Sequence, residues 1–79
     1  MKVKYVGKQV GTVGLDSDGV YDVLEIDELC GALRIVDESG EDYLYHPQRP
    51  KTLDQEYQGG RFEIVEDDEA GSLKKAIYG

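Results

Sequence analysis

The sequence predicts one small all-β domain, and three observations lead to that prediction. The chain has 79 residues, of which 39% are hydrophobic, so it can form one modest core and is too short for two. Its apolar residues gather in short clusters, some of which alternate with polar residues in the manner of half-buried strands. Glycine, aspartate and serine separate these clusters, as turns require.

Five segments have the pattern of strands: 2–6, 20–26, 32–37, 41–45 and 62–65. The second is the strongest because it is rich in β-branched and aromatic residues and has turn residues on both sides. Its alternation breaks at Val23 and Leu24, which predicts either a β-bulge or a strand that passes from one sheet to another. The residues expected to form the core are Val3, Tyr5, Val23, Ile26, Leu33, Ile35, Leu44, Phe62 and Ile64.

The connections between the strands differ in length. A long glycine-containing loop spans 7–19, where Val13 and Leu15 are candidates to tuck inward, and a short turn spans 27–31. A tight hairpin spans 38–40, and both prolines lie in a long loop from 46 to 60 that has room for one short helix at Leu53 and Tyr57. Residues 1–66 form the expected domain, and 67–79 an acidic linker with a short helix capped by Ser72, which frays unless it docks.

This order of connections favours a small five-stranded Src-homology-3-like barrel. Its long first loop corresponds to residues 7–19, and its tight distal hairpin to 38–40. The rival fold is the five-stranded oligonucleotide-binding barrel, which carries a helix between its third and fourth strands. Only Glu38–Gly40 lie at that position here, and they leave no room for a helix.

A further resemblance rests on three segments: VYDVLEI at 20–26, RIVDESGEDYLY at 34–45 and FEIV at 62–65. Over residues 3–6 and 20–65 the chain resembles a group of small proteins of low-GC Gram-positive bacteria, some of them encoded near phage-derived genes. The resemblance implies an isolated Src-homology-3-like barrel and, for some members, a phage-related setting. It supplies no activity and no catalytic residues that could be carried over to this chain. In that group the connection before the last strand is short, whereas here residues 48–61 lengthen it.

The charge of the chain restricts its partners. The formal net charge is −8, and residues 15–45 carry ten acidic side chains against the single basic Arg34. Such a field repels phosphate backbones and anionic lipids, so we expect no direct nucleic-acid binding and no membrane binding. The acidic charge also favours a monomer. The polar start of the chain and its single cysteine, Cys30, favour the cytoplasm.

Catalytic and metal-binding patterns are weak in this sequence. His46 is the only histidine, and one histidine with one cysteine cannot supply the three or four ligands that zinc needs. We expect the thiol of Cys30, among acidic neighbours, to be unreactive. Residues 16–19 read as a turn, because their glycine is misplaced for a calcium loop. We therefore expect no enzyme, no metal and no cofactor.

The tyrosines are the most informative feature for function. Tyr43 and Tyr45 share one face of the fourth segment, and both rings point outward if Leu44 faces the core. Tyr21 joins them from a neighbouring segment, and the acidic residues Glu41 and Asp42 adjoin them. Exposed tyrosines in an acidic surround suit a non-catalytic protein-interaction module with a basic protein or peptide partner. Two alternatives stay open: the rings cover the end of the barrel or pack under the loop at 46–61, or the chain is an acidic inhibitor that imitates nucleic acid.

Overall fold

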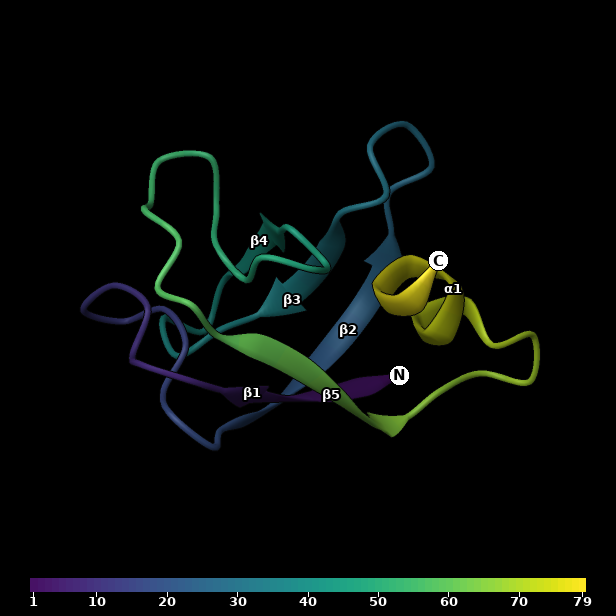
Figure 1. The fold of residues 1–79 in the computed structure, drawn as a ribbon, viewed down its shortest axis with the longest axis horizontal. Helices are drawn as coiled ribbons and strands as arrows, with labels where there is room; N and C mark the ends of the chain where they lie inside the picture. The colour runs from purple at the N-terminus through teal and green to yellow at the C-terminus, as the bar shows by residue number, and fades with distance from the viewer.

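The computed structural model describes all 79 residues and contains five strands and one helix (Figure 1). The five predicted strands are present, each within two residues of its predicted bounds. The elements in chain order are β1 (Lys2–Val6), β2 (Val20–Ile26), β3 (Leu33–Val36), β4 (Asp42–Tyr45), β5 (Arg61–Glu66) and α1 (Ser72–Tyr78).

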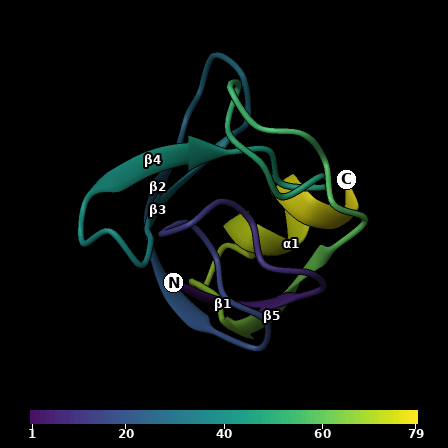
Figure 2. The ribbon, with the colours of Figure 1, turned by 90° about the vertical axis from the view of Figure 1, so that its left-hand side faces the viewer.

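The strands form one antiparallel sheet in the order β4-β3-β2-β1-β5. The sheet curls around the interior, as Figure 2 shows, but β4 and β5 do not pair, so both are edge strands and the sheet is not closed. The predicted β class is confirmed. The register between β2 and β3 shifts between Val23 and Glu25, which confirms the irregularity predicted at this point.

Six of the nine predicted core residues are buried: Val3, Tyr5, Val23, Leu33, Ile35 and Phe62. Ile26 and Ile64 are partly buried and pack against this core. The prediction for Leu44 is wrong, because Leu44 is only half-buried and Tyr45 takes the interior position.

Strand pairing explains which face of β4 points inward. Residues directly opposite each other in an antiparallel pair have side chains on the same face of the sheet. Tyr45 lies opposite Leu33 and Tyr43 lies opposite Ile35, and both β3 residues are fully buried. The two tyrosines therefore share the interior face.

The loop from 7 to 19 contributes to the core although it contains no long strand. Val10 and Leu15 form an isolated β-bridge with two backbone hydrogen bonds of 2.8 and 3.0 Å, and both side chains are buried. Gly14 lies so close to this bridge that an added Cβ would be 2.2 Å from the carbonyl oxygen of Val10. The prediction that Leu15 tucks inward is confirmed, whereas the prediction for Val13 is wrong, because Val13 is exposed.

The loop from 46 to 60 contains no helix, so the helix considered at Leu53 and Tyr57 is absent. The side chain of Leu53 is 97% exposed and has no buried face on which a helix could pack. Interactions within the loop hold it in place instead. The Lys51 ammonium donates to the carbonyl oxygens of Thr52 and Gln55 at 3.2 and 3.0 Å.

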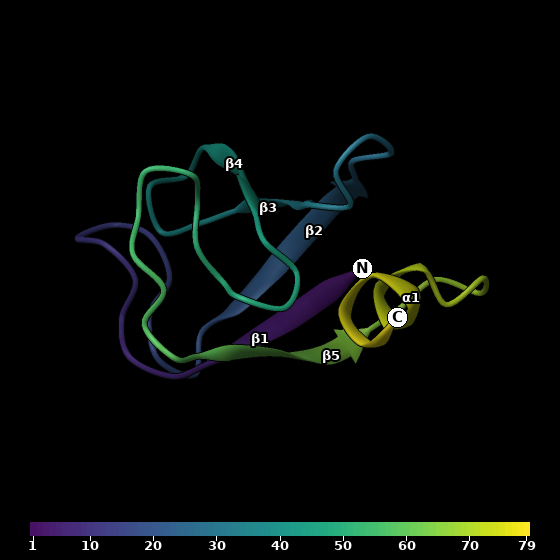
Figure 3. The ribbon, with the colours of Figure 1, turned by 45° about the horizontal axis from the view of Figure 1, so that its top comes forward.

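Helix α1 docks onto the sheet instead of fraying, and it contacts β2 and β5. Figure 3 shows it beside the end of β5. Its buried residues, Leu73 and Ile77, belong to the same hydrophobic cluster as the strands. The predicted cap at Ser72 is wrong, because Gly71 occupies the N-cap position. Asp67 accepts hydrogen bonds from the backbone N–H groups of Leu73 and Lys74 at 2.9 and 3.1 Å.

The same contacts set the acidity of the residues before the helix. Desolvation would raise the pKa of Asp67, but the hydrogen bonds from Leu73 and Lys74 outweigh it and lower that pKa. The pKa of Asp68 is lowered by hydrogen bonds from the hydroxyl and N–H of Ser72.

The structure contains no helix with the length and apolar character that crossing a membrane requires.

Candidate functional site

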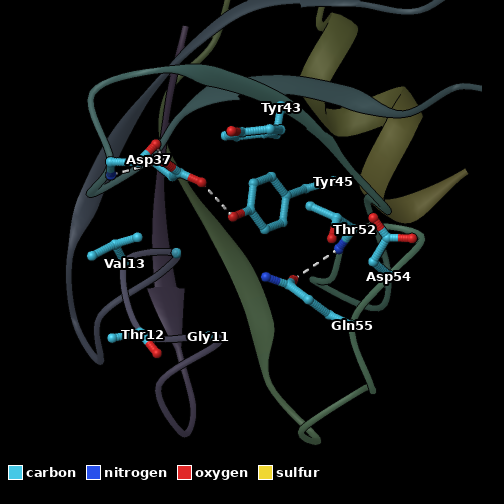
Figure 4. A pocket seen from close by; sticks show the side chains of 11 residues that line it. Gly11, Thr12, Val13, Asp37, Tyr43, Tyr45, Thr52, Asp54 and Gln55 are labelled. Carbon is cyan, nitrogen blue, oxygen red and sulfur yellow. Dashed lines mark hydrogen bonds between the residues drawn. The ribbon is translucent and has the colours of Figure 1, made fainter.

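A pocket of about 250 Å³ opens beside the interior face of β4 (Figure 4). Three chain segments build its walls: the loop at 11–14, the β3–β4 hairpin and the loop at 52–55. Figure 4 shows Tyr43 and Tyr45 near the upper part of the pocket, Asp37 and Val13 to one side, and Gln55 and Asp54 to the other. The long loops thus bring residues that are distant in sequence to one opening.

A buried carboxylate and a buried phenol are joined at this pocket. Asp37 is only 7% exposed, and its Oδ2 accepts a hydrogen bond of 2.7 Å from the hydroxyl of Tyr45. Its Oδ1 accepts from the backbone N–H and the hydroxyl of Ser39 at 2.9 and 2.5 Å. Burial and the hydrogen bond to Asp37 raise the pKa of Tyr45, so its phenol remains a donor far into alkaline solution.

Tyr43 supplies an exposed aromatic ring to the same pocket. The side chain is 44% exposed, and its hydroxyl donates to Oε2 of Glu41 at 2.8 Å. This hydrogen bond is the main reason that the pKa of Tyr43 is raised. The bond anchors the hydroxyl of Tyr43 to a neighbouring acid, and part of the side chain remains accessible.

The pocket is lined by acidic side chains without a basic one. Asp37 and Asp54 are its ionisable carboxyl groups, and no lysine, arginine or histidine is among the lining residues. A carboxylate beside an aromatic ring attracts a cation, both as an ion pair and through the negative face of the ring. The arrangement therefore suits a lysine or arginine side chain.

The five residues predicted to form the binding surface do not form one continuous patch. Tyr43 and Tyr45 line the pocket, with Glu41 hydrogen-bonded to Tyr43. Asp42 lies on the opposite face of β4, where it forms an ion pair of 3.2 Å with Arg34. Tyr21 does not line this pocket.

The expectation that Tyr21 and Tyr45 are exposed is wrong, since both rings are buried in the core. The hydroxyl of Tyr21 donates to Glu38 at 2.6 Å and accepts the N–H of Asp16 at 2.7 Å. Burial and the bond to Glu38 raise the pKa of Tyr21. Hydrogen bonds to acidic partners thus allow these tyrosines to serve as core residues.

Asp37, Asp54 and Gln55 belong to the pocket although the sequence analysis did not single them out. Asp37 follows β3 directly and precedes the tight hairpin, so its position at a strand end was visible in the sequence. Nothing in the sequence indicated that the loop containing Asp54 folds back beside it. Only the three-dimensional course of the long loop brings these carboxyl groups to one cavity.

The other candidate residues have local structural roles. Nδ1 of His46 accepts the N–H groups of Gln48 and Arg49 at 3.1 and 3.0 Å, so this imidazole stabilises a turn. Oδ1 of Asp27 accepts the N–H groups of Leu29 and Cys30, which lowers the pKa of Asp27. No three His, Cys, Asp or Glu side chains are grouped closely enough to hold a metal ion.

A second pocket of about 250 Å³ lies beside Leu44, whose side chain points to the opposite face of β4 from Tyr43 and Tyr45. Its apolar lining includes Ala32, Leu44, Pro47 and Leu53. Thr52 lines both pockets, so the two cavities approach each other at this residue.

Comparison with known proteins finds no match to a protein-family model, a curated protein or a solved structure. The interpretation of the two pockets therefore depends on their own geometry and charge.

Proposed function

We propose that the chain is a non-catalytic protein-interaction module, and that the pocket beside Tyr43 receives a lysine or arginine side chain of a protein partner. The observation that carries this proposal is the lining of the pocket. Asp37 and Asp54 line it together with the exposed side chain of Tyr43, and no lysine, arginine or histidine is among the lining residues.

The energetics predict a weak and reversible contact. An exposed ion pair contributes about 0.2–1 kcal/mol, and an exposed cation–π contact contributes about 0.5–1 kcal/mol. These terms are sufficient for selecting a basic side chain but not for tight binding. The partner must therefore make further contacts around the pocket, as interaction modules commonly require.

A binding assay with a synthetic peptide tests the proposal. The probe is acetyl-Gly-Val-Lys-Val-Lys-Val-Gly-amide carrying a fluorophore, and its control replaces both lysines by glutamine. Fluorescence anisotropy should detect saturable binding of the lysine peptide, and the glutamine peptide should bind more weakly. Increasing salt should reduce the difference, because the attraction between exposed charges is screened.

A matched pair of variants locates the binding site. Asp54→Asn removes one carboxylate from the pocket, and Glu56→Gln removes an exposed acid of the same loop that does not line the pocket. Asp54→Asn should weaken binding by about 1.4- to 5-fold, the range that corresponds to an exposed ion pair of about 0.2–1 kcal/mol. Equal effects of the two variants, or equal binding of the lysine and glutamine peptides, would count against the proposal.

We also propose that the sheet belongs to the Src-homology-3-like class of small barrels. Two observations support this assignment: β1 pairs with both β2 and β5, and β2, β3 and β4 follow as a meander. The long loop at 7–19 and the tight β3–β4 hairpin also lie where that class has them. An experimental structure in which β1 and β5 are unpaired would contradict the assignment.

The alternative of a nucleic-acid mimic receives less support. A mimic needs a continuous row of acids that is free to meet a basic protein surface. Several acids here have partners within the chain: Arg34 pairs with Glu25 and Asp42, and Arg61 pairs with Glu63. We therefore favour the protein-interaction module.

A further inference from the structure

We propose that an extended segment of the partner adds to the free edge of β4 as an antiparallel strand, with its basic side chain in the pocket beside Tyr43. The neighbouring residues of that segment are apolar and lie on the opposite face, in the pocket beside Leu44. This inference rests on the proposed function for the cationic contact and goes beyond it by specifying the backbone conformation and residue pattern of the partner.

The first observation is the set of free backbone groups along β4. Glu41 accepts the N–H of Asp37, and the register places Tyr43 and Tyr45 in the equivalent hydrogen-bonding positions toward β3. The N–H and C=O groups of Asp42 and Leu44 consequently point away from β3. Because β4 is the last strand of the sheet, no other strand pairs with them.

The chain itself occupies the next outward position along this edge. The N–H of His46 donates to the carbonyl oxygen of Lys51 at 3.0 Å, where the following loop turns back beside the end of β4. This hydrogen bond closes the edge at His46, so only the backbone groups of Asp42 and Leu44 remain for a partner. The open stretch is short and accommodates only a few residues of a partner.

The second observation is that the two pockets flank this strand. Residues of an added strand alternate between the two faces of the sheet, as do the residues of β4. A residue opposite Tyr43 points to the face with the acidic pocket, and a residue opposite Leu44 points to the face with the apolar pocket. Backbone hydrogen bonds then supply affinity and the alternating pockets supply specificity.

The sequence of β4 protects this edge only in part. Edge strands commonly avoid pairing by short length, charged side chains, proline, a bulge or a covering loop. Strand β4 is four residues long and carries one charged residue, Asp42, which pairs with Arg34, but it has neither lysine nor proline. Its register with β3 is also regular throughout. The edge is thus competent to pair with another strand.

Charge determines which occupant fits. A second copy of the chain would bring its own Glu41 and Asp42 to the same acidic edge, and each chain has a net charge of −8. A basic segment gains the attraction that a second copy lacks. The occupant is therefore a partner segment in which lysine or arginine alternates with apolar residues.

Backbone methylation of the peptide probe tests the added strand directly. In an antiparallel arrangement the residues opposite Asp42 and Leu44 direct their N–H groups toward β4. These residues are the valines of acetyl-Gly-Val-Lys-Val-Lys-Val-Gly-amide, because their side chains share the face of Leu44. The N–H groups of the lysines point to solvent, so N-methylation of the lysines is the matched control.

N-methylation of the central valine should weaken binding about tenfold. The methyl group removes one hydrogen-bond donor and separates the two paired backbones. N-methylation of a lysine should leave binding within about twofold of the unmodified peptide. Equal losses, no loss in either peptide, or a loss only on lysine methylation would overturn the proposed antiparallel strand.

A second pair of variants tests the apolar pocket without disturbing the core. Leu53 lines this pocket and is 97% exposed, whereas Leu29 is 98% exposed and does not line it. Leu53→Ser should weaken the valine-containing peptide several-fold and Leu29→Ser should not. Lysine-dependent binding without these effects would sustain the proposed function and refute the added strand, and absence of lysine-dependent binding would refute the proposed function.

Discussion

The buried tyrosine at the pocket provides the sharpest test of the structure, because it reverses the expectation from the sequence. Tyr45→Phe keeps the ring in the core and removes only the hydroxyl that donates to Asp37 at 2.7 Å. A hydrogen bond to a charged group contributes about 1.5–3 kcal/mol, and Asp37 retains its two bonds from Ser39. We therefore expect the free energy of unfolding of Tyr45→Phe to be about 1.5–3 kcal/mol lower than that of the wild type.

Urea denaturation followed by circular dichroism measures this change. For a domain of this size the denaturant slope is about 1 kcal/mol per M, so the midpoint should fall by about 1.5–3 M while the slope stays constant. Tyr43→Phe is the matched control, since it removes a hydroxyl that bonds to the exposed Glu41 on the same strand. Equal effects of the two variants, or a change below about 0.5 kcal/mol for Tyr45→Phe, would refute the reasoning.

Three further predictions concern stability. Leu73→Ala should lower the free energy of unfolding by about 2–5 kcal/mol, because it empties a fully buried position of α1, whereas alanine at either exposed lysine of the helix should have little effect in the same urea titration. Gly60→Ala should destabilise by about 1–3 kcal/mol, since its methyl group would lie 2.4 Å from the phenol oxygen of Tyr5, and a wild-type denaturation midpoint would contradict this contact. The pKa of Tyr21 and Tyr45 is raised above the unfolded value of about 10, so the folded state holds these protons more tightly and stability should fall as pH rises above about 10. Each tyrosine contributes a slope of no more than about 1.4 kcal/mol per pH unit, which urea titrations at pH 9, 10 and 11 can measure, and a flat profile would contradict the two buried phenols.

The strands and their order were predictable from local patterns. The β2 segment has a β-branched and aromatic composition between two turns, and the hairpin glycine Gly40 has a φ of 82°, as the tight turn required. These features depend on neighbours in sequence. They are therefore visible without knowledge of the tertiary structure.

The direction of β4 was not predictable from its own residues. Tyr43, Leu44 and Tyr45 are all able to occupy a core, so either face of this strand was a plausible interior. The register with β3 decides the choice by placing Leu33 opposite Tyr45. The sequence indicates that the two tyrosines share a face, but not which face is buried.

The loops account for most of what the sequence could not indicate. Val10 and Leu15 lie between glycines without strand periodicity, yet the bridge between them places both in the core. In the same way, the acidic pocket depends on the path of the 46–60 loop, which places Asp54 in the same cavity as Asp37. Long-range contacts of irregular segments have no periodic signal in a single sequence.

The most direct test of the central claim is a titration of the isotope-labelled chain with the lysine-containing peptide, followed by amide chemical shifts. The proposal predicts saturable shifts that cluster at residues 11–14, at Tyr43 and Tyr45 and at 52–55, with much smaller shifts for the glutamine peptide. Shifts of equal size for both peptides, or shifts that avoid these residues, would contradict a pocket that binds a basic side chain.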